Sequence, residues 1–482
     1  MTLLAVVLAA AAAASAHLQF STNNTQAQAA FDRGLFLYYA YNGDDAVRDF
    51  TQAAALDPQS AMAYWGVALS KGPDLNTPIT QERFTAAADA SRKAAAMDAG
   101  ASSLERGMIA AMALRYKGTF ADWAADDQAY RHAMLSLAES SHDENVRLIA
   151  AEALLEHGGL EWENGSLADD GSRTALKLVD GVLHDDPSSV MANHLCIHLY
   201  DLAPDRAPAL PCAQRLDATN FAPQAEHLAH MPAHYWIETG DYAAALRSSD
   251  RAYVLMAQLQ GDADSLHTQH YEKHDVAVGY SAAMMLGNYG DAQRWSERMT
   301  AAFGQRFAAL TALRFGRYEA AYAAAGNEFA AKSVRGLAAL HLGRNDEART
   351  LVKDIPATNF AQGYLPQLFL ARLEEAQANY EEAQRWLERA RTNQQSGLGG
   401  ELIPWIPADE ALGTLALRRG DNTGAVTAFK ATLQLYPNDP RALYGLAQAL
   451  GAAGQPTEAA ATRTRFEKMW QGADTPVAGA LP

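Results

Sequence analysis

The chain has 482 residues, of which 49% are hydrophobic, so it is long enough to bury a large core. Its 39 basic and 56 acidic residues give a formal net charge of −17. Because phosphate binding needs a basic surface, this balance argues against nucleic acid as a partner and favours cationic or metal-like ligands. Alanine is abundant and β-branched residues are scarce, which favours helix over strand.

Residues 1–16 have the pattern of a secretory signal peptide. Their apolar run from Leu3 to Ala14 is too short to span a bilayer, and the Ala-Ser-Ala that ends at Ala16 is an A-x-A-type cleavage site. We therefore expect a periplasmic or secreted protein. The sequence holds no other long apolar stretch, so we predict no membrane span.

Aromatic residues gather near the N-terminus, at Tyr38, Tyr39, Tyr41, Tyr64 and Trp65. Aromatic side chains at the helical positions of a repeat usually pack between helices. We therefore interpret this cluster as helix-packing core rather than as a binding site.

A Gly-x-x-x-x-Ala pattern recurs along the second half of the chain. Glycine ends one helix in a left-handed turn, and the small alanine lets the next helix pack closely against the first. The glycines are Gly240, Gly287, Gly316, Gly343, Gly420 and Gly454, and Ala378 takes the same place in a further unit. The pattern predicts an all-α fold, a superhelical array of helix–turn–helix repeats.

The array divides by composition into regions. We predict a signal peptide over 1–16, N-terminal helical repeats over 17–180, a histidine-rich central region over 181–300 and C-terminal repeats over 301–482. Segments 159–172 and 392–410 carry Gly, Asn, Asp and Pro and are predicted to be loops.

Two units carry small, aromatic and proline residues at matching spacings. The early unit has Gly34, Ala46, Phe50, Ala53 and Pro58, and the late unit has Gly413, Ala425, Phe429 and Pro437. These spacings resemble the tetratricopeptide repeat, a 34-residue helix–turn–helix. The resemblance covers most of the chain, although the units are irregularly spaced. It implies a concave groove that serves as a binding scaffold.

The central region is also similar to a block found in a group of bacterial repeat proteins. That block reads His-x3-His, followed by Gly-His-Leu-x-His-Met-Pro-x-His. Here it corresponds to His194 through His198 and to residues 226–234. Glu226 stands where the group tends to have Gly, and Asp201 where it tends to have Glu. This resemblance implies a fold and a shared block, and it supplies no reaction.

Eight of the fourteen histidines lie between His194 and His274. In the register that the repeat resemblance implies, groove-lining positions are occupied by His194, His198, Asp201, His227, His230, His234 and His274. The helical wheel agrees, because residues three, four and seven apart share one face of a helix. We therefore expect six histidines and one aspartate to face a single concave surface. Glu152 joins them if Gly158 ends its helix.

Imidazole is the commonest metal ligand, and carboxylates complete mixed sites. We accordingly predict a transition-metal site for Zn, Cu or Fe, with the six histidines as candidate ligands. If the protein is an enzyme, the metal would activate water or oxygen, and Asp201 or Glu152 is the candidate base.

Two other interpretations stay open at this stage. One is a metal-free groove that binds a peptide or protein partner, or a small-molecule substrate. The other is a set of separate histidines, each bonded to a backbone carbonyl.

Two cysteines, Cys196 and Cys212, lie on helices that we expect to form a hairpin. They either form a disulfide in an oxidising compartment or serve as two small buried residues.

Overall fold

The computed structural model describes residues 16–260, 272–303, 306–326, 329–356, 358–359, 363–397 and 406–477. The predicted signal peptide, apart from Ala16, lies outside these residues. Helices make up nearly all of the regular structure in the described chain, which confirms the all-α prediction. Among those same residues, no helix is both long and apolar enough to cross a membrane.

The chain forms two compact units, one of Met1–Tyr235 with Arg251–Gln269 and one of Trp236–Asp250 with His270–Pro482. The boundaries predicted near residues 180 and 300 remain predictions.

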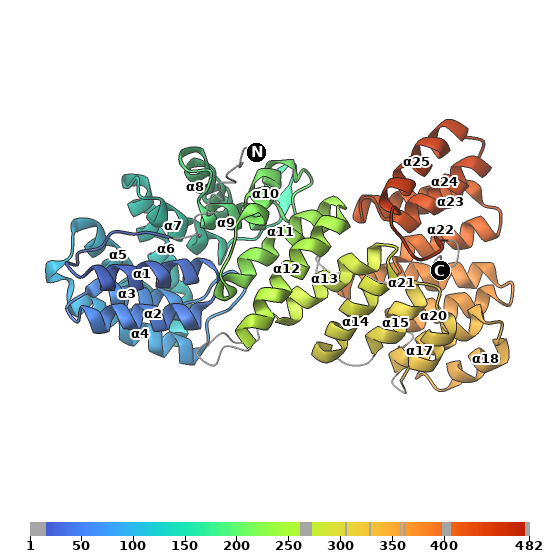
Figure 1. The fold of residues 1–482 in the computed structure, drawn as a ribbon, viewed down its shortest axis with the longest axis horizontal. Coiled ribbons are helices and arrows are strands. Elements are labelled where there is room, and N and C mark those ends of the chain that lie inside the picture. The colour runs from blue at the N-terminus through green and yellow to red at the C-terminus, as the bar shows by residue number, and fades with distance from the viewer. Residues whose placement is uncertain are drawn as a thin grey trace, which may run out of the picture. The chain divides into compact units, whose positions relative to one another are not determined.

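In the first unit, each helix packs against the next one along the chain from α1 to α10 (Figure 1). These helices are α1 (Thr25–Tyr39), α2 (Gly43–Leu56), α3 (Ala61–Lys71), α4 (Gln81–Ala96), α5 (Ser103–Arg115), α6 (Trp123–Ser140), α7 (Glu144–Leu155), α8 (Asp170–Asp185), α9 (Val190–Tyr200) and α10 (Leu210–Ala218). Two further helices, α11 (Glu226–Thr239) and α12 (Tyr242–Gln260), contribute residues to both units.

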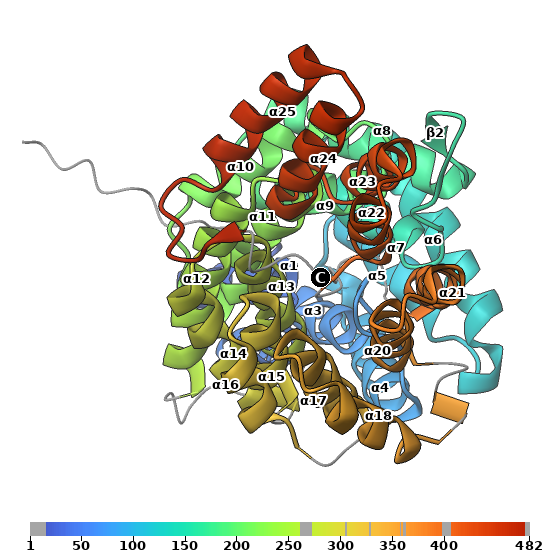
Figure 2. The ribbon, with the colours of Figure 1, turned by 90° about the vertical axis from the view of Figure 1, so that its right-hand side faces the viewer.

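The second unit continues the same construction (Figure 2). Its helices are α13 (Glu272–Met285), α14 (Tyr289–Phe303), α15 (Arg306–Arg314), α16 (Tyr318–Ala324), α17 (Phe329–His341), α18 (Asn345–Lys353), α20 (Tyr364–Glu375), α21 (Tyr380–Gly397), α22 (Ala408–Arg418), α23 (Asn422–Leu435), α24 (Pro440–Ala452) and α25 (Pro456–Met469).

The two helical repeats that have matching residue spacings in the sequence also have the same internal packing. In the first, the fully buried ring of Phe50 lies so close to Gly34 and Gly66 that a methyl group on either glycine would overlap it. In the second, Phe429 lies in the same way between two glycines of α22 and α24, Gly413 and Gly445. A large ring thus fills the groove between three helices whose backbones approach closely.

Left-handed turns separate the helices of each pair, as the Gly-x-x-x-x-Ala pattern predicted. Backbone φ is +68° to +80° at Gly240, Gly316, Gly343, Gly420 and Gly454, and it is +63° at Ala378. Glycine adopts this conformation without steric strain, so it ends the first helix and turns the chain toward the second.

The segment predicted as a loop over 392–410 is helical at both of its described ends. Helix α21 extends to Gly397 and α22 begins at Ala408, so this part of the prediction was wrong.

Two further sequence predictions about turns and loops were also wrong. Gly287 is not among the left-handed glycines; a methyl group there would overlap Trp470 and Ala473, so the residue serves close approach rather than a turn. The segment predicted as a loop over 159–172 contains a short antiparallel hairpin, β1 (Trp162–Glu163) with β2 (Ser166–Leu167), and α8 begins at Asp170. Such short strands carry too little alternation to be seen in a sequence.

Candidate functional site

Helix α9 places His194 and His198 one turn apart on one face. His194 is fully buried, His198 is half-buried, and their Nε2 atoms are 3.1 Å apart. The spacing of four residues produces this approach because a helix advances one turn in about 3.6 residues.

A backbone carbonyl fixes the tautomer of His194. Its Nδ1 atom lies 3.1 Å from the carbonyl oxygen of Tyr39. Because a carbonyl oxygen only accepts, Nδ1 carries the hydrogen, and the lone pair of Nε2 is directed toward His198. Burial lowers the pKa of His194 to about 3, so the ring is neutral at pH 7.

Helix α11 supplies the third ring, that of His227. This side chain is 1% exposed, and its ring centroid lies 5.1 Å from that of His194. One nitrogen from each of His194, His198 and His227 can be chosen so that all three lie within 4.8 Å of one another. We refer to these three residues as the histidine triad.

Tyr41 packs against every ring of the histidine triad. Its ring centroid lies 4.6 Å from that of His194, 5.2 Å from that of His227 and 6.2 Å from that of His198. It occupies the turn between α1 and α2 with φ of +54°, where later units have glycine. A bulky residue in this conformation is strained, and such strain persists where surrounding contacts enforce it.

The turn that carries Tyr41 is held against the start of α11. Asn42 donates from Nδ2 to the carbonyl oxygen of Gln224 at 3.0 Å, and Ala40, Ala225 and Leu228 form one buried apolar cluster. These contacts join the first repeat to a helix almost two hundred residues later. They therefore set the position of His227 relative to the turn.

Glu152, on α7, is connected to the histidine triad through tyrosines. Tyr38 donates to its Oε2 atom at 2.5 Å, and Tyr41 is a second side-chain hydrogen-bond partner. Burial, reinforced by the nearby Glu156, raises the pKa of Glu152 well above its usual value. The carboxyl group is therefore suited to hold a proton at neutral pH, which makes it a better proton donor than a ready base.

The other candidate base, Asp201, follows the last residue of α9 as its C-cap. It is half-buried and is not a member of the histidine triad.

The remaining predicted ligands do not join the histidine triad. His230 and His234, both buried on α11, form their own pair with Nε2 atoms 2.9 Å apart. His274 is half-buried near the start of α13 and belongs to the second unit. His267 and His270 lie outside the described residues. We predicted a single surface of six histidines. Within the first unit, these histidines instead form two groups, the histidine triad and the adjacent pair of His230 and His234.

Sequence reasoning missed the tyrosines. It assigned Tyr38, Tyr39 and Tyr41 to core packing, and all three are indeed buried. Their polar groups nevertheless have specific partners, because Tyr39 donates to Asn145 at 2.7 Å and Tyr38 to Glu152. The one available signal was the bulky residue at position 41, where the repeat pattern calls for glycine.

The two cysteines form a disulfide that joins α9 to α10. Cys196 therefore offers no thiol to the neighbouring His194 and His198. The alternative of two free buried cysteines is excluded.

Comparison with known proteins identifies the repeat. The tetratricopeptide repeat family model matches residues 410–470. No curated protein sequence matches the chain. The chain is similar in structure to yeast Tom70, with 13% identity, 93% of each chain covered and a TM-score of 0.30. It is also similar to the APC/C Cut9–Hcn1 hetero-tetramer, with 12% identity, 82% of this chain and 78% of that chain covered, and a TM-score of 0.38. For the human IFIT1 dimer with m7Gppp-AAAA, the identity is 12%, the coverage 94% and 91%, and the TM-score 0.33. These low identities and TM-scores do not indicate that the chain binds the ligands or partners of those proteins. Helical repeats of this kind typically serve as scaffolds for protein or peptide partners.

Proposed function

Because the chain is a tetratricopeptide repeat protein, we propose that its first unit is a binding scaffold that holds one transition-metal ion through His194, His198 and His227. Zinc suits these ligands best among the predicted metals. Three neutral imidazoles are the ligand set of open zinc sites, in which a fourth position takes water or a substrate.

The observation that carries this proposal is the orientation of His194. The carbonyl of Tyr39 takes the Nδ1 hydrogen, so Nε2 presents its lone pair to the space shared with His198. Outer partners of this kind orient metal-bound histidines and fix their tautomers. The lone pair of a neutral imidazole is the group that binds a transition-metal ion, and His194 directs it toward a second imidazole.

The nitrogen spacing also supports the proposal. Two imidazole nitrogens bound to tetrahedral zinc at roughly 2.0–2.1 Å are separated by roughly 3.3 Å. The two Nε2 atoms of His194 and His198 are 3.1 Å apart, so small ring movements would place an ion between them. His227 is the third ligand after a similar adjustment, since its candidate atom already lies within 4.8 Å of the others.

Zinc in this position would supply a bound water of lowered pKa. Glu152 would hold a proton close to that position, and Tyr41 would connect its carboxyl group to the three rings. We propose no reaction beyond this arrangement.

Zinc titration of the metal-free protein by isothermal calorimetry tests the proposal, with elemental analysis of the loaded protein. We expect one equivalent bound at the histidine triad, with affinity reduced at least 10-fold in His198→Gln and in His227→Gln. The matched control is His132→Gln, an exposed histidine on α6, which should bind zinc as the parent does. Circular dichroism checks that each variant is folded.

Three results would overturn the assignment. Equal zinc affinity in His198→Gln and His132→Gln would exclude the histidine triad. Loss of zinc only in a His230→Gln, His234→Gln double variant would move the site to the adjacent pair. A folded protein that binds none of Zn, Cu or Fe would leave the metal-free groove as the better interpretation.

We also propose that the protein is exported. The apolar run of residues 3–14 supports this, and so does the Cys196–Cys212 disulfide, because disulfides persist in oxidising compartments. N-terminal sequencing of the protein expressed from its full-length gene should find His17 as the first residue. A reduced protein that retains its first sixteen residues would contradict export.

A further inference from the structure

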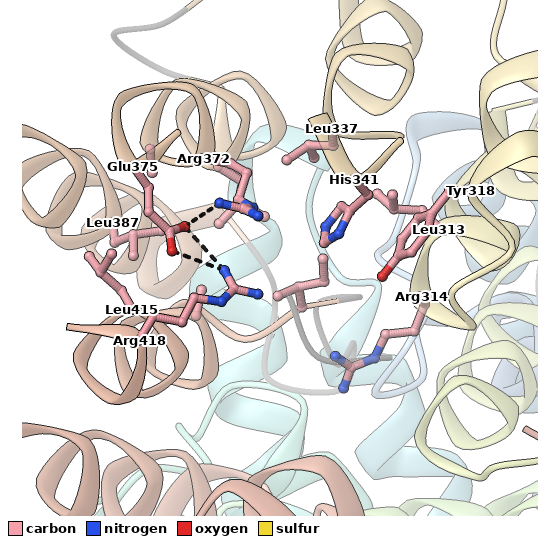
Figure 3. Close-up of a pocket in the computed structure, with 14 residues that line it drawn as sticks. Leu313, Arg314, Tyr318, Leu337, His341, Arg372, Glu375, Leu387, Leu415 and Arg418 are labelled. Atoms are coloured by element: carbon pink, nitrogen blue, oxygen red, sulfur yellow. Dashed lines mark hydrogen bonds and ion pairs between the residues drawn. The ribbon is translucent and has the colours of Figure 1, made fainter. Parts of the chain in front are cut away.

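A pocket of the second unit lies between α15, α17, α20 and α22, and the carboxylates in and beside it are paired with arginines (Figure 3). Glu375 accepts hydrogen bonds from Arg372 at 2.8 Å and from Arg418 at 3.1 Å. Arg314, also at the wall, donates to the buried Glu410 at 2.6 Å and 2.8 Å. Each of these two carboxylates therefore has a guanidinium group that compensates for its negative charge.

The same pocket contains a buried histidine. His341 stacks on Tyr318, with ring centroids 4.2 Å apart and an angle of 4° between the planes. Burial, with Arg372 and Arg418 nearby, lowers the pKa of His341 to about 3, so this ring is neutral at pH 7. A buried histidine in this pocket therefore avoids the cost of an uncompensated charge by staying neutral.

Helix α7 of the first unit carries two glutamates in a different situation. Glu152 and Glu156 are one helical turn apart, Glu152 is fully buried, and the side chain of Glu156 is 3% exposed. Among the described residues of the first unit, the one fully buried arginine is Arg115. It donates to Glu156 and, at 2.8 Å, to Asp127. The guanidinium group is thus bonded to two carboxylates, neither of which is that of Glu152.

Glu152 has hydroxyl partners instead. Tyr38 donates to its Oε2 atom at 2.5 Å, and Tyr41 is its second side-chain partner. A hydroxyl group stabilises a carboxylate by a hydrogen bond but does not neutralise its charge. A buried carboxyl group in this position avoids an uncompensated charge by holding a proton.

The surroundings of the two glutamates favour a bound proton. Burial, with Glu156 and Asp74 nearby, raises the pKa of Glu152 well above its usual value. Burial, with Asp127 and Asp74 nearby, raises the pKa of Glu156 to about 8, although Arg115 opposes this rise. The pair is therefore suited to share at least one proton at neutral pH. The titratable groups that face it are Tyr38 of α1, Tyr41 of the following turn, Asp74 of the α3–α4 loop, Arg115 of α5, and Asp127 and Tyr130 of α6.

Tyr41 places this pair beside the histidine triad. It is a hydrogen-bond partner of Glu152, and its ring centroid lies 4.6–6.2 Å from those of the three histidines. One side chain therefore connects Glu152 to the rings. A divalent cation held by these rings would act on Glu152 through the protein interior, where charges interact more strongly than in water. It would favour the carboxylate over the carboxylic acid.

We propose that a metal ion bound at the histidine triad displaces one proton from the pair of Glu152 and Glu156, which then supplies a negative charge beside the ion. This inference rests on the proposed metal site. The O–H bond of one carboxylic acid breaks, the proton passes to the solvent, and the carboxylate remains. The buried site then gains one positive charge fewer than the ion carries. Metal binding should consequently weaken as the pH falls, because solvent protons compete with the ion.

Isothermal calorimetry at pH 7 in PIPES and in HEPES counts the protons, because the observed heat includes that of buffer protonation. Zinc binding to Glu152→Gln should release about one proton fewer than zinc binding to the parent. Removing either carboxyl group of a pair that shares a proton removes that proton. The matched control is Glu144→Gln, a half-buried glutamate at the start of the same helix whose pKa burial also raises. This control should release as many protons as the parent.

Infrared difference spectra test the proposal on the unmodified protein. When zinc is added to the metal-free parent at pH 7, the C=O stretch of a protonated carboxyl group should disappear. Glu152→Gln should lack this loss, and Glu144→Gln should retain it. Between pH 7 and pH 8, zinc affinity should rise up to about 10-fold more in the parent than in Glu152→Gln, since one released proton contributes one power of ten per pH unit. Circular dichroism establishes that both variants are folded.

The outcomes separate this inference from the proposed function. Zinc binding with equal proton release in the parent and in Glu152→Gln would overturn the inference and leave the metal site intact. So would a zinc difference spectrum without loss of a protonated carboxyl group, or an equal reduction of proton release in Glu152→Gln and Glu144→Gln. A folded parent that binds no zinc would overturn both the proposed metal site and the inference.

Discussion

The repeat at α1–α2 and the repeat at α22–α23 are built on the same packing and differ at one turn. Phe50 and Phe429 are fully buried between paired glycines in the same way. The later turn has Gly420 at φ of +80°, which is unstrained, whereas the earlier one has Tyr41 at +54°. The strained tyrosine is also the residue that contacts all three rings of the histidine triad. Shared positions therefore maintain the fold, and the departure from the pattern marks the site.

The largest expected effect lies in the part that the two repeats share. Phe50→Ala and Phe429→Ala should each lower the free energy of unfolding by roughly 3–5 kcal/mol, because each leaves a cavity between three helices. Urea denaturation followed by circular dichroism measures the loss. Leu435→Ala, at a 49% exposed position on the same helix as Phe429, is the control and should change the free energy by less than about 1 kcal/mol. Comparable losses at Leu435 and Phe429 would contradict the packing account.

The next effect tests what makes the two repeats different. Tyr41→Gly places a glycine in the α1–α2 turn, as the α22–α23 turn has at Gly420. The change also removes the ring that supports the histidine triad. We expect zinc affinity to fall about 10- to 100-fold, the range observed when an outer partner of a metal ligand is removed. Gly420→Ala, in the second unit, should leave zinc affinity unchanged while destabilising its own turn by about 1 kcal/mol. Calorimetry measures the zinc affinity of both variants. An unchanged affinity in Tyr41→Gly would show that the turn does not support the metal site.

The units also share a feature in their histidines, since burial lowers the pKa of both His194 and His341 to about 3. A neutral buried ring must be protonated after unfolding at low pH, so its stabilising contribution is complete above pH 6.5. It is lost progressively as the pH falls from 6.5 toward 3. For His341 this amounts to about 2 kcal/mol between pH 7.5 and pH 5.

Denaturation at both pH values, on the parent and on His341→Gln, measures this contribution. The variant should lose about 2 kcal/mol less than the parent on acidification. NMR should show that the His341 ring stays neutral at pH 5, while that of the exposed His132 titrates. A His341 ring that titrates near pH 6.5 would contradict the pocket environment described above.

The smallest effect concerns a turn without a site. Ala378 has the same left-handed conformation as Tyr41, with φ of +63°. Among the described residues, no group of metal-ligating side chains includes a neighbour of Ala378 in the chain. Ala378→Gly should therefore stabilise the protein by up to about 1 kcal/mol. Glycine relieves the backbone strain of the folded state, and this gain is partly offset by the larger entropy of the unfolded chain. Thermal melting measures it. A clear loss of stability would imply a role for Ala378 beyond the turn.

The fold could be predicted because its determinants are local. A glycine that ends the first helix, an alanine five residues later and a large ring on the second helix all act within one helix pair. Five of the six glycines in the pattern have the predicted left-handed conformation. Gly287 is the exception, because its requirement comes from Trp470 and Ala473, almost two hundred residues away in the chain. A short sequence motif cannot distinguish the two causes.

The candidate site was only partly predictable for the same reason. The sequence by itself determined which histidines share a helix face, since four-residue spacing places His194 beside His198 and His230 beside His234. Tertiary structure alone decided that His227 joins the first of these pairs, that Tyr41 lies against all three rings, and that Glu152 reaches them through tyrosines. The pocket of Arg372 and Arg418 likewise gathers side chains from helices of separate repeats. Helical periodicity specifies neighbours within a turn, whereas contacts between repeats depend on how whole helices pack.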